Sequence, residues 1–208
     1  MALSEKVALV TGASRGISRS VALKLVQEGA HIAMDYNQNR EAAEQTLTVL
    51  PDGPHHIFQA DIADATAVEE MLAAVIDQMG GLHIVVNNAA INEWQPPLRV
   101  EYEVWNDVWR RRLDTNLVGP ANVMFWAARH MAENGGGQIV KLSSRGAFRG
   151  TPKAPAYAAS KAARNYQNLI NGCLVNHIKQ KSVLDAQCHS ERSEESDPSE
   201  RSFATGSG

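Results

Sequence analysis

Short apolar runs alternate along the chain with segments of helical periodicity, and this alternation restricts the fold more than any other feature of the sequence. The runs lie at residues 6–10, 31–34, 56–58, 83–86 and 138–142. Between the first two runs, Ile17, Val21 and Leu25 fall on one face of a helix. Strands that alternate with helices form a parallel sheet covered by helices on both faces. We therefore predict an α/β fold with five strands, with Gly29 and Gly80 at helix ends.

The composition is that of a soluble globular domain, since 44% of the 208 residues are hydrophobic and 21% are charged. The net charge of −3 is spread along the chain without a basic block. This pattern argues against nucleic acid or an anionic membrane as a partner and favours a small molecule. The N-terminus lacks the features of a signal peptide, and no stretch reaches the roughly 18 apolar residues of a membrane span. We therefore expect a cytoplasmic protein.

Neither a disulfide nor a metal site is predicted. Cys173 and Cys188 are the only cysteines, and neither has a CxxC partner. The seven histidines are scattered without the spacing of metal ligands.

The C-terminal segment differs in composition from the rest of the chain. Residues 189–208 contain one Phe and one Ala as their only hydrophobic residues, against six serines and five acidic residues. Such a segment cannot bury enough apolar surface to offset the entropy lost on ordering. We therefore expect a folded domain over residues 1–186 and a low-complexity, disordered tail over 187–208.

A glycine-containing loop follows the first apolar run, in the segment TGASRGIS at 11–18. Glycine at a strand-to-helix turn lets the backbone approach a pyrophosphate, whose charge then lies at the positive end of the helix. A glycine pair alone is equally compatible with a purely structural turn. The candidate cofactor-binding residues of this loop are Gly12, Ser14, Arg15, Gly16 and Ile17.

One tyrosine–lysine pair has a spacing that suits acid–base chemistry. Tyr157 and Lys161 are four residues apart, so on a helix they share a face, and a nearby ammonium favours an ionised phenol. Ser144 lies 13 residues before Tyr157, just after the fifth run, and Asn116 lies in a predicted long helix. A Tyr–Lys pair alone arises by chance on exposed helices. Chance does not readily explain the occurrence of this pair together with Ser144, Asn116 and the glycine loop.

These motifs together resemble the short-chain dehydrogenase/reductase family over about residues 4–166. The loop is similar to the TGxxxGxG of that family, with Ser18 in place of the third glycine. The segment 87–90 is similar to its NNAG, with Ala90 in place of the glycine. The 3-oxoacyl reductases are the most similar subgroup. The resemblance implies a Rossmann-type, doubly wound parallel sheet of order 3-2-1-4-5, and it makes residues 1–186 a dinucleotide-binding and catalytic domain.

The resemblance further implies an NAD(P)-dependent oxidoreductase that interconverts a ketone and a secondary alcohol, and a homo-oligomer. Tyr157 would exchange a proton with the carbonyl oxygen, Ser144 would polarise the carbonyl, and Lys161 would hold the nicotinamide ribose. Asn116 would position a water molecule. Beyond the loop, the cofactor-binding residues implied are Asp61, Ile62, Asn88, Ala89, Tyr157 and Lys161.

The same resemblance favours NADP over NAD, with NAD still open. Arg15 precedes Gly16 where NADP-using relatives carry a basic residue, although a solvated cation at the helix start is the alternative. The discriminating position at the end of the second strand falls on Tyr36, and strand alternation predicts that Asp35 points to the opposite side. If the position of Ser18 requires a positive φ or a very close approach, its Cβ costs about 1 kcal/mol.

The resemblance ends after residue 166. The family continues with a sixth strand, a loop that closes over nicotinamide and substrate, and a seventh strand, and none of them is recognisable in residues 167–187. We therefore expect a sheet that ends at its fifth strand with an unpaired edge, a coding sequence interrupted near residues 164–172, low stability and impaired activity. A lineage-specific variant is the alternative to an interruption. The rival functional hypotheses are a non-catalytic dinucleotide-binding fragment or scaffold and a chain without a stable fold.

Two further features have structural interpretations. The tryptophans are expected to pack in the core or on an oligomer face rather than form a substrate cage. They are Trp94, Trp105, Trp109 and Trp126. The run WRRRLD at 109–114 is expected to form a solvated helix face.

Overall fold

A parallel β-sheet forms the centre of the computed structural model, which describes residues 2–94, 96–166 and 178–183. The order of its strands is β3-β2-β1-β4-β5-β6. The strands are β1 (Val7–Val10), β2 (His31–Tyr36), β3 (His56–Gln59), β4 (Ile84–Asn87), β5 (Gly137–Leu142) and β6 (Ile178–Val183). The predicted Rossmann-type α/β fold and the strand order 3-2-1-4-5 are confirmed.

The described sheet is one strand longer than predicted. β6 pairs in parallel with β5 along its whole length, from Gly137 opposite Ile178 to Leu142 opposite Val183. The expectation that the sheet ends at its fifth strand with an unpaired edge is therefore wrong. The β6 sequence, IKQKSV, lacks the apolar run that marks a parallel strand buried on both faces, so periodicity does not reveal it. Hydrogen bonds between the backbone groups of β6 and β5 hold this strand in the sheet instead.

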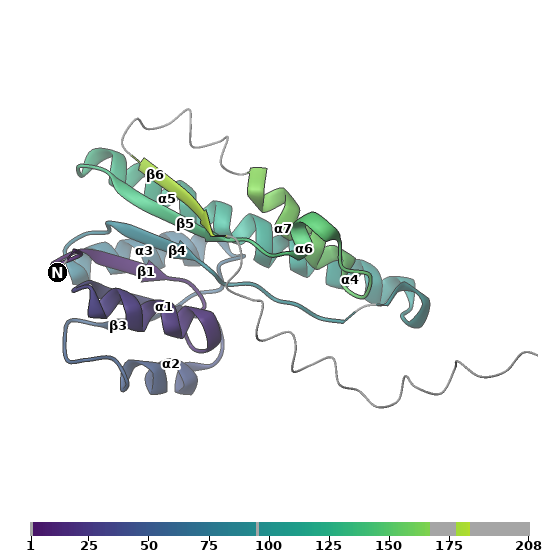
Figure 1. Ribbon diagram of the computed structural model, residues 1–208, viewed down its shortest axis with the longest axis horizontal. Coiled ribbons are helices and arrows are strands. Elements are labelled where there is room, and N and C mark those ends of the chain that lie inside the picture. Colours follow the sequence, from purple (N-terminus) through teal and green to yellow (C-terminus); the bar gives the residue numbers. More distant parts are fainter. Residues whose placement is uncertain (1, 95, 167–177, 184–208) are drawn as a thin grey trace, which may run out of the picture.

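Helices cover both faces of the sheet (Figure 1). On one face, α1 (Gly16–Gln27) and α2 (Arg40–Leu47) cover a core that contains Val10 of β1. On the other face, α3 (Ala65–Met79) and α5 (Gly119–Glu133) cover a core that contains Leu9 of the same strand. Both residues are completely buried, as expected for a central strand of a doubly wound sheet.

The remaining helices lie toward the carboxyl ends of the strands (Figure 1). They are the 3₁₀ helix η1 (Pro97–Arg99), α4 (Tyr102–Leu113), the π-helical segment η2 (Asp114–Val118), α6 (Gly146–Arg149) and α7 (Pro155–Tyr166). α7 packs against α4, η2 and α6. In doubly wound sheets, ligands bind beyond the carboxyl ends of the strands, so these helices mark the end of the molecule where a site is expected.

Local sequence signals account for several helix boundaries. The Asp64 carboxylate accepts hydrogen bonds from the backbone N–H groups of Thr66 and Ala67, at 2.8 and 3.2 Å, and begins α3. Gly80 ends α3 in the left-handed conformation, with φ of 78°, and Gly29 has φ of 96° after α1. The two predicted helix ends are therefore confirmed.

None of the described helices is long and apolar enough to cross a membrane. The tail predicted over residues 187–208 lies outside the described residues.

Candidate cofactor and catalytic site

The glycine loop after β1 touches the segment that follows β4. Gly12 has φ of +65°, and a Cβ added there would lie 3.1 Å from both Cα and Cβ of Ala89. The Thr11 hydroxyl accepts hydrogen bonds from the backbone N–H groups of Asn88 and Ala89, each at 3.1 Å. Gly12 is therefore required both by its backbone conformation and by this close approach.

The N-terminus of α1 has the features of an anion-binding site. Its first turn contains no acidic residue, and Arg15 at the N-cap position makes no side-chain capping hydrogen bond. The first N–H groups of such a helix carry a partial positive charge and have no partner within the helix. Gly16, with φ of +60°, has open space where a Cβ would point. The backbone here leaves room for a phosphate.

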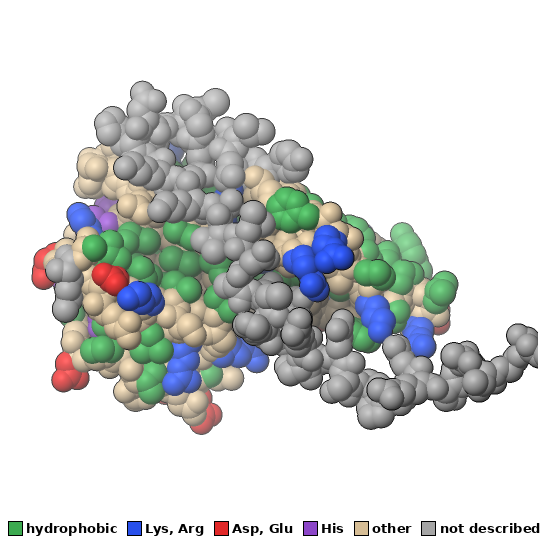
Figure 2. All heavy atoms as spheres, in the orientation of Figure 1, with side chains coloured by type: hydrophobic (Ala, Val, Ile, Leu, Met, Phe, Trp, Pro, Cys, Tyr) green, Lys and Arg blue, Asp and Glu red, His purple; other side chains and the backbone are tan. Residues whose placement is uncertain are grey.

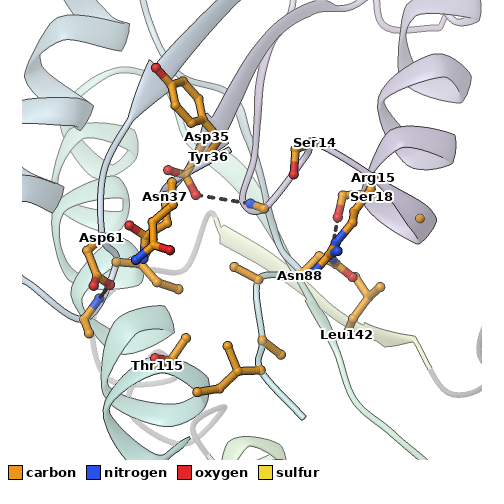
Figure 3. A pocket seen from close by; sticks show the side chains of 18 of the residues that line it. Ser14, Arg15, Ser18, Asp35, Tyr36, Asn37, Asp61, Asn88, Thr115 and Leu142 are labelled. Atoms are coloured by element: carbon orange, nitrogen blue, oxygen red, sulfur yellow. Dashed lines mark hydrogen bonds between the residues drawn. The ribbon is translucent and has the colours of Figure 1, made fainter. Parts of the chain in front are cut away.

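Ser18 fits its position without strain. It lies within α1, and the only described non-glycine residue with positive φ is Glu5. The position of Ser18 therefore does not require a positive φ, and the Cβ of this residue causes no backbone strain. The Ser18 hydroxyl accepts a hydrogen bond from the Asn88 amide, and this contact ties α1 to the end of β4 (Figure 3).

Asp35 and Tyr36 point to opposite sides, as strand alternation predicts, but the carboxylate is the group that faces the glycine loop (Figure 3). Asp35 Oδ2 accepts a hydrogen bond of 3.1 Å from the backbone N–H of Gly12, and Oδ1 has no partner among the described residues. Burial raises the pKa of Asp35 to about 7, against the opposing effect of the Gly12 hydrogen bond. Sequence reasoning, which attended to Tyr36, missed this contact.

One cavity of about 860 Å³ joins the glycine loop to α7. Every predicted cofactor-binding residue lies on its wall. They are Gly12, Ser14, Arg15, Gly16, Ile17, Asp61, Ile62, Asn88, Ala89, Tyr157 and Lys161. The open helix N-terminus lies along the wall, so these residues fit an elongated ligand that carries phosphate groups.

Tyr157 and Lys161 lie on the cavity wall near the end of β5. Lys161 Nζ lies 5.6 Å from the centroid of the Tyr157 ring and donates a 3.1 Å hydrogen bond to the backbone carbonyl of Leu142. Burial, followed by the charge of Arg164, lowers the pKa of Lys161 to about 7. This lysine therefore gains and loses its proton near neutral pH.

Ser144 lies beside Tyr157, although the described cavity wall includes Ser143 rather than Ser144. A Cβ added to Gly146 would lie 3.6 Å from Ser144 Oγ and 3.9 Å from Cδ1 of Tyr157, so both groups approach one point. Ser144 Oγ also accepts a 3.2 Å hydrogen bond from the Gly146 backbone N–H. The structure therefore brings together the serine and the tyrosine that the sequence separates by 13 residues.

Asn116 lies in the π-helical segment η2 and is completely buried. Its side chain accepts a 2.8 Å hydrogen bond from the Ile91 backbone N–H and donates one of 2.9 Å to the Ile91 carbonyl. It also donates to Ser160 Oγ on α7, at 3.1 Å. Asn116 is not on the described cavity wall, and its amide instead links the chain after β4 to α7.

Buried cations near α7 are the functional candidates that sequence reasoning missed. Arg112 is completely buried, so the expectation of a solvated face at 109–114 is wrong there, although Arg110 and Arg111 are exposed. Lys141 and Arg164 are also buried, whereas Figure 2 shows other Lys and Arg side chains at the surface. The one available signal was the spacing of Arg164, seven residues after Tyr157 on the same helix face.

The tryptophans take mainly packing positions. Trp105 and Trp109 pack with ring centroids 5.9 Å apart, and Trp126 packs against the core under α3 and α5. Trp94 is 65% exposed, and Lys153 Nζ lies 4.3 Å from its ring centroid.

Comparison with known proteins places these motifs in one family. A family model described as short chain dehydrogenase matches residues 6–170. The chain is 40% identical over 159 residues to a Staphylococcus aureus (strain N315) protein named 3-oxoacyl-(acyl-carrier-protein) reductase FabG, covering 76% of this chain and 63% of that protein. It is 34% identical over 169 residues to a short-chain type dehydrogenase/reductase of Picea abies, covering 77% of this chain and 62% of that protein.

A third relative, from Synechocystis sp., is named 3-oxoacyl-(acyl-carrier-protein) reductase and is 32% identical over 163 residues. The alignment covers 77% of this chain and 64% of that protein. The chain thus spans slightly less than two thirds of the length of the curated relatives it matches.

Proposed function

The chain belongs to the short-chain dehydrogenase family, and we propose that it is an oxidoreductase that interconverts a ketone and a secondary alcohol with a nicotinamide dinucleotide. The observation that carries the proposal is that the glycine loop, Tyr157 and Lys161 line one and the same cavity. A dinucleotide needs a phosphate site and a reaction site joined in this way.

Residues that follow β1, β3 and β4 would hold the cofactor. The loop at Gly12 and Gly16 and the N-terminus of α1 would hold the pyrophosphate. Asp61 and Ile62, together with Asn88 and Ala89, would hold the adenosine half. When bound, the nicotinamide supplies or accepts a hydride at the substrate carbon.

The reaction end of the cavity provides a proton and a hydrogen bond. In reduction, the phenol of Tyr157 donates its proton to the carbonyl oxygen while the carbonyl carbon gains a hydride, and in oxidation the phenolate takes the proton back. Ser144 Oγ donates a hydrogen bond that polarises the same oxygen. Lys161 holds the nicotinamide ribose and relays protons, which suits its pKa of about 7. Asn116 holds η2 against α7 through Ser160 and positions a water molecule.

We propose NADP as the preferred cofactor. Arg15 is exposed at the entrance to α1, where a basic side chain can pair with a 2′-phosphate. The wall beyond β2 is formed by three uncharged amide side chains, Asn37, Gln38 and Asn39. NAD is the alternative, because the Asp35 carboxyl group lies on the same wall and an anion there disfavours a phosphate.

A 3-oxoacyl thioester is the first substrate to test, since relatives from two bacterial groups carry names that specify 3-oxoacyl substrates. A homo-oligomer is also proposed. Its support is a set of exposed hydrophobic side chains on and between α4 and α5, namely Tyr102, Val104, Val118 and Phe125.

Replacing Tyr157 with Phe tests the proposed function. Tyr157→Phe removes the proton donor and keeps the ring, so turnover should fall by about 10²–10⁴-fold while cofactor affinity stays nearly unchanged. Tyr102→Phe, at a tyrosine that is 71% exposed, serves as the matched control and should retain full activity. NADPH oxidation and NADPH binding would be measured for each protein.

Equal turnover of Tyr157→Phe and the unaltered chain would refute the assignment of the proton donor. Cofactor binding without turnover in the unaltered chain would instead favour a non-catalytic dinucleotide-binding protein.

A further inference from the structure

Histidine side chains accept backbone hydrogen bonds at the amino end of the sheet, opposite the end where α4, α6 and α7 lie (Figure 1). His83 Nδ1 accepts a 3.1 Å hydrogen bond from the backbone N–H of Val7, the first residue of β1. His55 Nδ1 accepts one of 3.1 Å from the backbone N–H of Ile32 in β2. His55 directly precedes β3 and His83 directly precedes β4, so each ring links the start of its own strand to the neighbouring strand.

A third histidine acts in the same way from a helix. His130, near the C-terminal end of α5, accepts a 3.3 Å hydrogen bond at Nε2 from the backbone N–H of Leu82. Leu82 is buried and lies two residues before β4 begins. Three imidazole rings therefore act as acceptors for backbone N–H groups at or near the starts of β1, β2 and β4.

These hydrogen bonds require neutral rings. A neutral imidazole has one nitrogen that donates and one that accepts, whereas an imidazolium has two donors and no acceptor. Protonation of His55 or His83 would turn Nδ1 into a donor that faces another donor. Val7 and Ile32 are 2% and 0% exposed, so water does not readily replace the lost acceptor. A buried N–H left without a partner costs free energy.

The surroundings of His83 oppose a positive charge on its ring. Burial, followed by the charges of Lys6 and His130, lowers the pKa of His83 below its ordinary value of 6.5. The folded chain thus holds this proton less tightly than the unfolded chain. The stability that His83 contributes is present above pH 6.5 and is lost as the pH falls through the lower, folded value.

The surroundings of His55 have the same effect. A Cβ added to Gly53 would lie only 2.8 Å from His55 Nε2, so the glycine leaves room for the ring. Burial lowers the pKa of His55, and the Pro51 backbone partly offsets this effect. The neighbouring His31 and His56 lower the pKa further. The contribution of this histidine to stability is therefore also lost on acidification.

We propose that His55, His83 and His130 form an acid-sensitive latch, whose neutral rings fasten β3 to β2, β4 to β1 and α5 to the start of β4, and which releases the amino end of the sheet on protonation. The inference does not depend on the proposed function, because none of the three histidines is on the described cavity wall.

Hydrogen exchange of single amides tests the latch in the full chain. The protection factors of the Val7 and Ile32 amides would be measured by NMR at pH 7.5 and pH 5. Each should fall by about tenfold or more at pH 5, because one buried hydrogen bond changes an opening equilibrium by about that factor. The Ala60 amide donates to the Tyr36 carbonyl at the other end of the sheet, at 3.1 Å, and its protection should change much less.

Two substitutions keep an acceptor and remove the titration. Asparagine places Oδ1 near the position of histidine Nδ1, so His55→Asn and His83→Asn preserve an acceptor that gains no proton. In the double variant, the protection of the Val7 and Ile32 amides should no longer fall at pH 5. His56→Asn, at an exposed histidine, is the matched control and should lose protection as the unaltered chain does.

The helical member of the latch is tested separately. Glutamine places Oε1 near the position of histidine Nε2, so His130→Gln should remove the pH dependence of the Leu82 amide. The pH dependence of the Val7 amide should remain in this variant, because its acceptor is His83. Circular dichroism would verify that each variant is folded. If the double variant does not fold, each single variant decides the question for its own amide.

Equal protection of the Val7, Ile32 and Leu82 amides at pH 7.5 and pH 5 in the unaltered chain would overturn the inference. A fall of the same size in the asparagine variants would also overturn it, as would a chain whose amides are unprotected at pH 7.5. Asp35 is present in every variant, so its opposite pH dependence cancels in the comparison. The measurement needs neither cofactor nor turnover, so its outcome is independent of the proposed function.

Discussion

Asp35 shows how one side chain acquires its properties from its surroundings. Its carboxyl group is 2% exposed and accepts a hydrogen bond from the Gly12 backbone, while Oδ1 stays unpaired among the described residues. Burial is the main cause of its raised pKa, and the nearby charge of Asp61 adds to it. An exposed aspartate with the same sequence neighbours would ionise well below neutral pH.

Asp35 should make the stability of the fold depend on pH. Because its pKa rises from 3.8 to about 7 on folding, the folded chain holds this proton more tightly than the unfolded chain. The stabilisation is complete below pH 3.8 and is lost as the pH rises through about 7. Asp35→Asn keeps an acceptor for Gly12 and removes the titration. Its free energy of unfolding, measured with urea from pH 5 to 8, should fall less with pH than that of the unaltered chain.

The exposed Asp52 provides the control for this comparison. Asp52→Asn should show the same pH dependence as the unaltered chain. Parallel curves for Asp35→Asn and Asp52→Asn would contradict the role given to burial.

At the scale of elements, the unit of β1, the glycine loop and α1 forms the part of the cavity wall that is proposed to hold the phosphates. The strand is buried along its whole length, and the helix begins with an uncapped, non-acidic first turn. The loop between them must cross over the segment at Ala89 with no side chain in the way. The sequence predicted this unit correctly because its signals are local.

Gly12→Ala should damage this unit more than the same substitution does at another glycine with a positive φ. A Cβ at Gly12 combines φ of +65° with contacts of 3.1 Å to Ala89, so NADPH binding should be lost and stability should fall by at least 1–2 kcal/mol, an approximate cost. Gly135→Ala is the matched control, because Gly135 has φ of +84° and nothing within 4 Å of a Cβ. It should lose stability from backbone strain alone and keep its NADPH affinity, as measured by fluorescence titration.

If Gly135→Ala lost NADPH binding to the same extent, general destabilisation would explain both results. The close approach of the loop to Ala89 would then carry no specific role.

At the scale of the whole molecule, the cavity depends on elements from most of the described chain. Its wall combines residues after β1, β2, β3, β4 and β5 with two residues of α7. A ligand that spans the cavity binds these elements only in their folded arrangement. Such a ligand stabilises the folded state by mass action.

Thermal unfolding with and without NADPH should therefore show a large difference. NADPH at about 100 times its dissociation constant contributes about 2.7 kcal/mol, which raises the midpoint of a chain of this size by roughly 5–10 °C. NADH at the same concentration should raise it less if Arg15 pairs with the 2′-phosphate. Differential scanning fluorimetry would measure both shifts.

A broad unfolding transition whose midpoint changes with neither nucleotide would show that the described core does not form a working cofactor site. A larger shift with NADH than with NADPH would identify NAD as the preferred cofactor. It would also identify Asp35 as the residue that determines this specificity.

The sequence by itself determined the α/β class, the strand order implied by its family resemblance, the glycine loop and the Tyr157–Lys161 pair. Each of these rests on spacing within a short segment, where helical and strand periodicity act directly. Only the tertiary structure decided the pairing of β6, the hydrogen bond between Asp35 and Gly12, and the burial of Arg112 and Arg164. These features depend on neighbours far away in the chain, namely β5, Gly12 and the elements packed around α7. A charged or polar residue looks solvated in sequence until the fold places other elements over it.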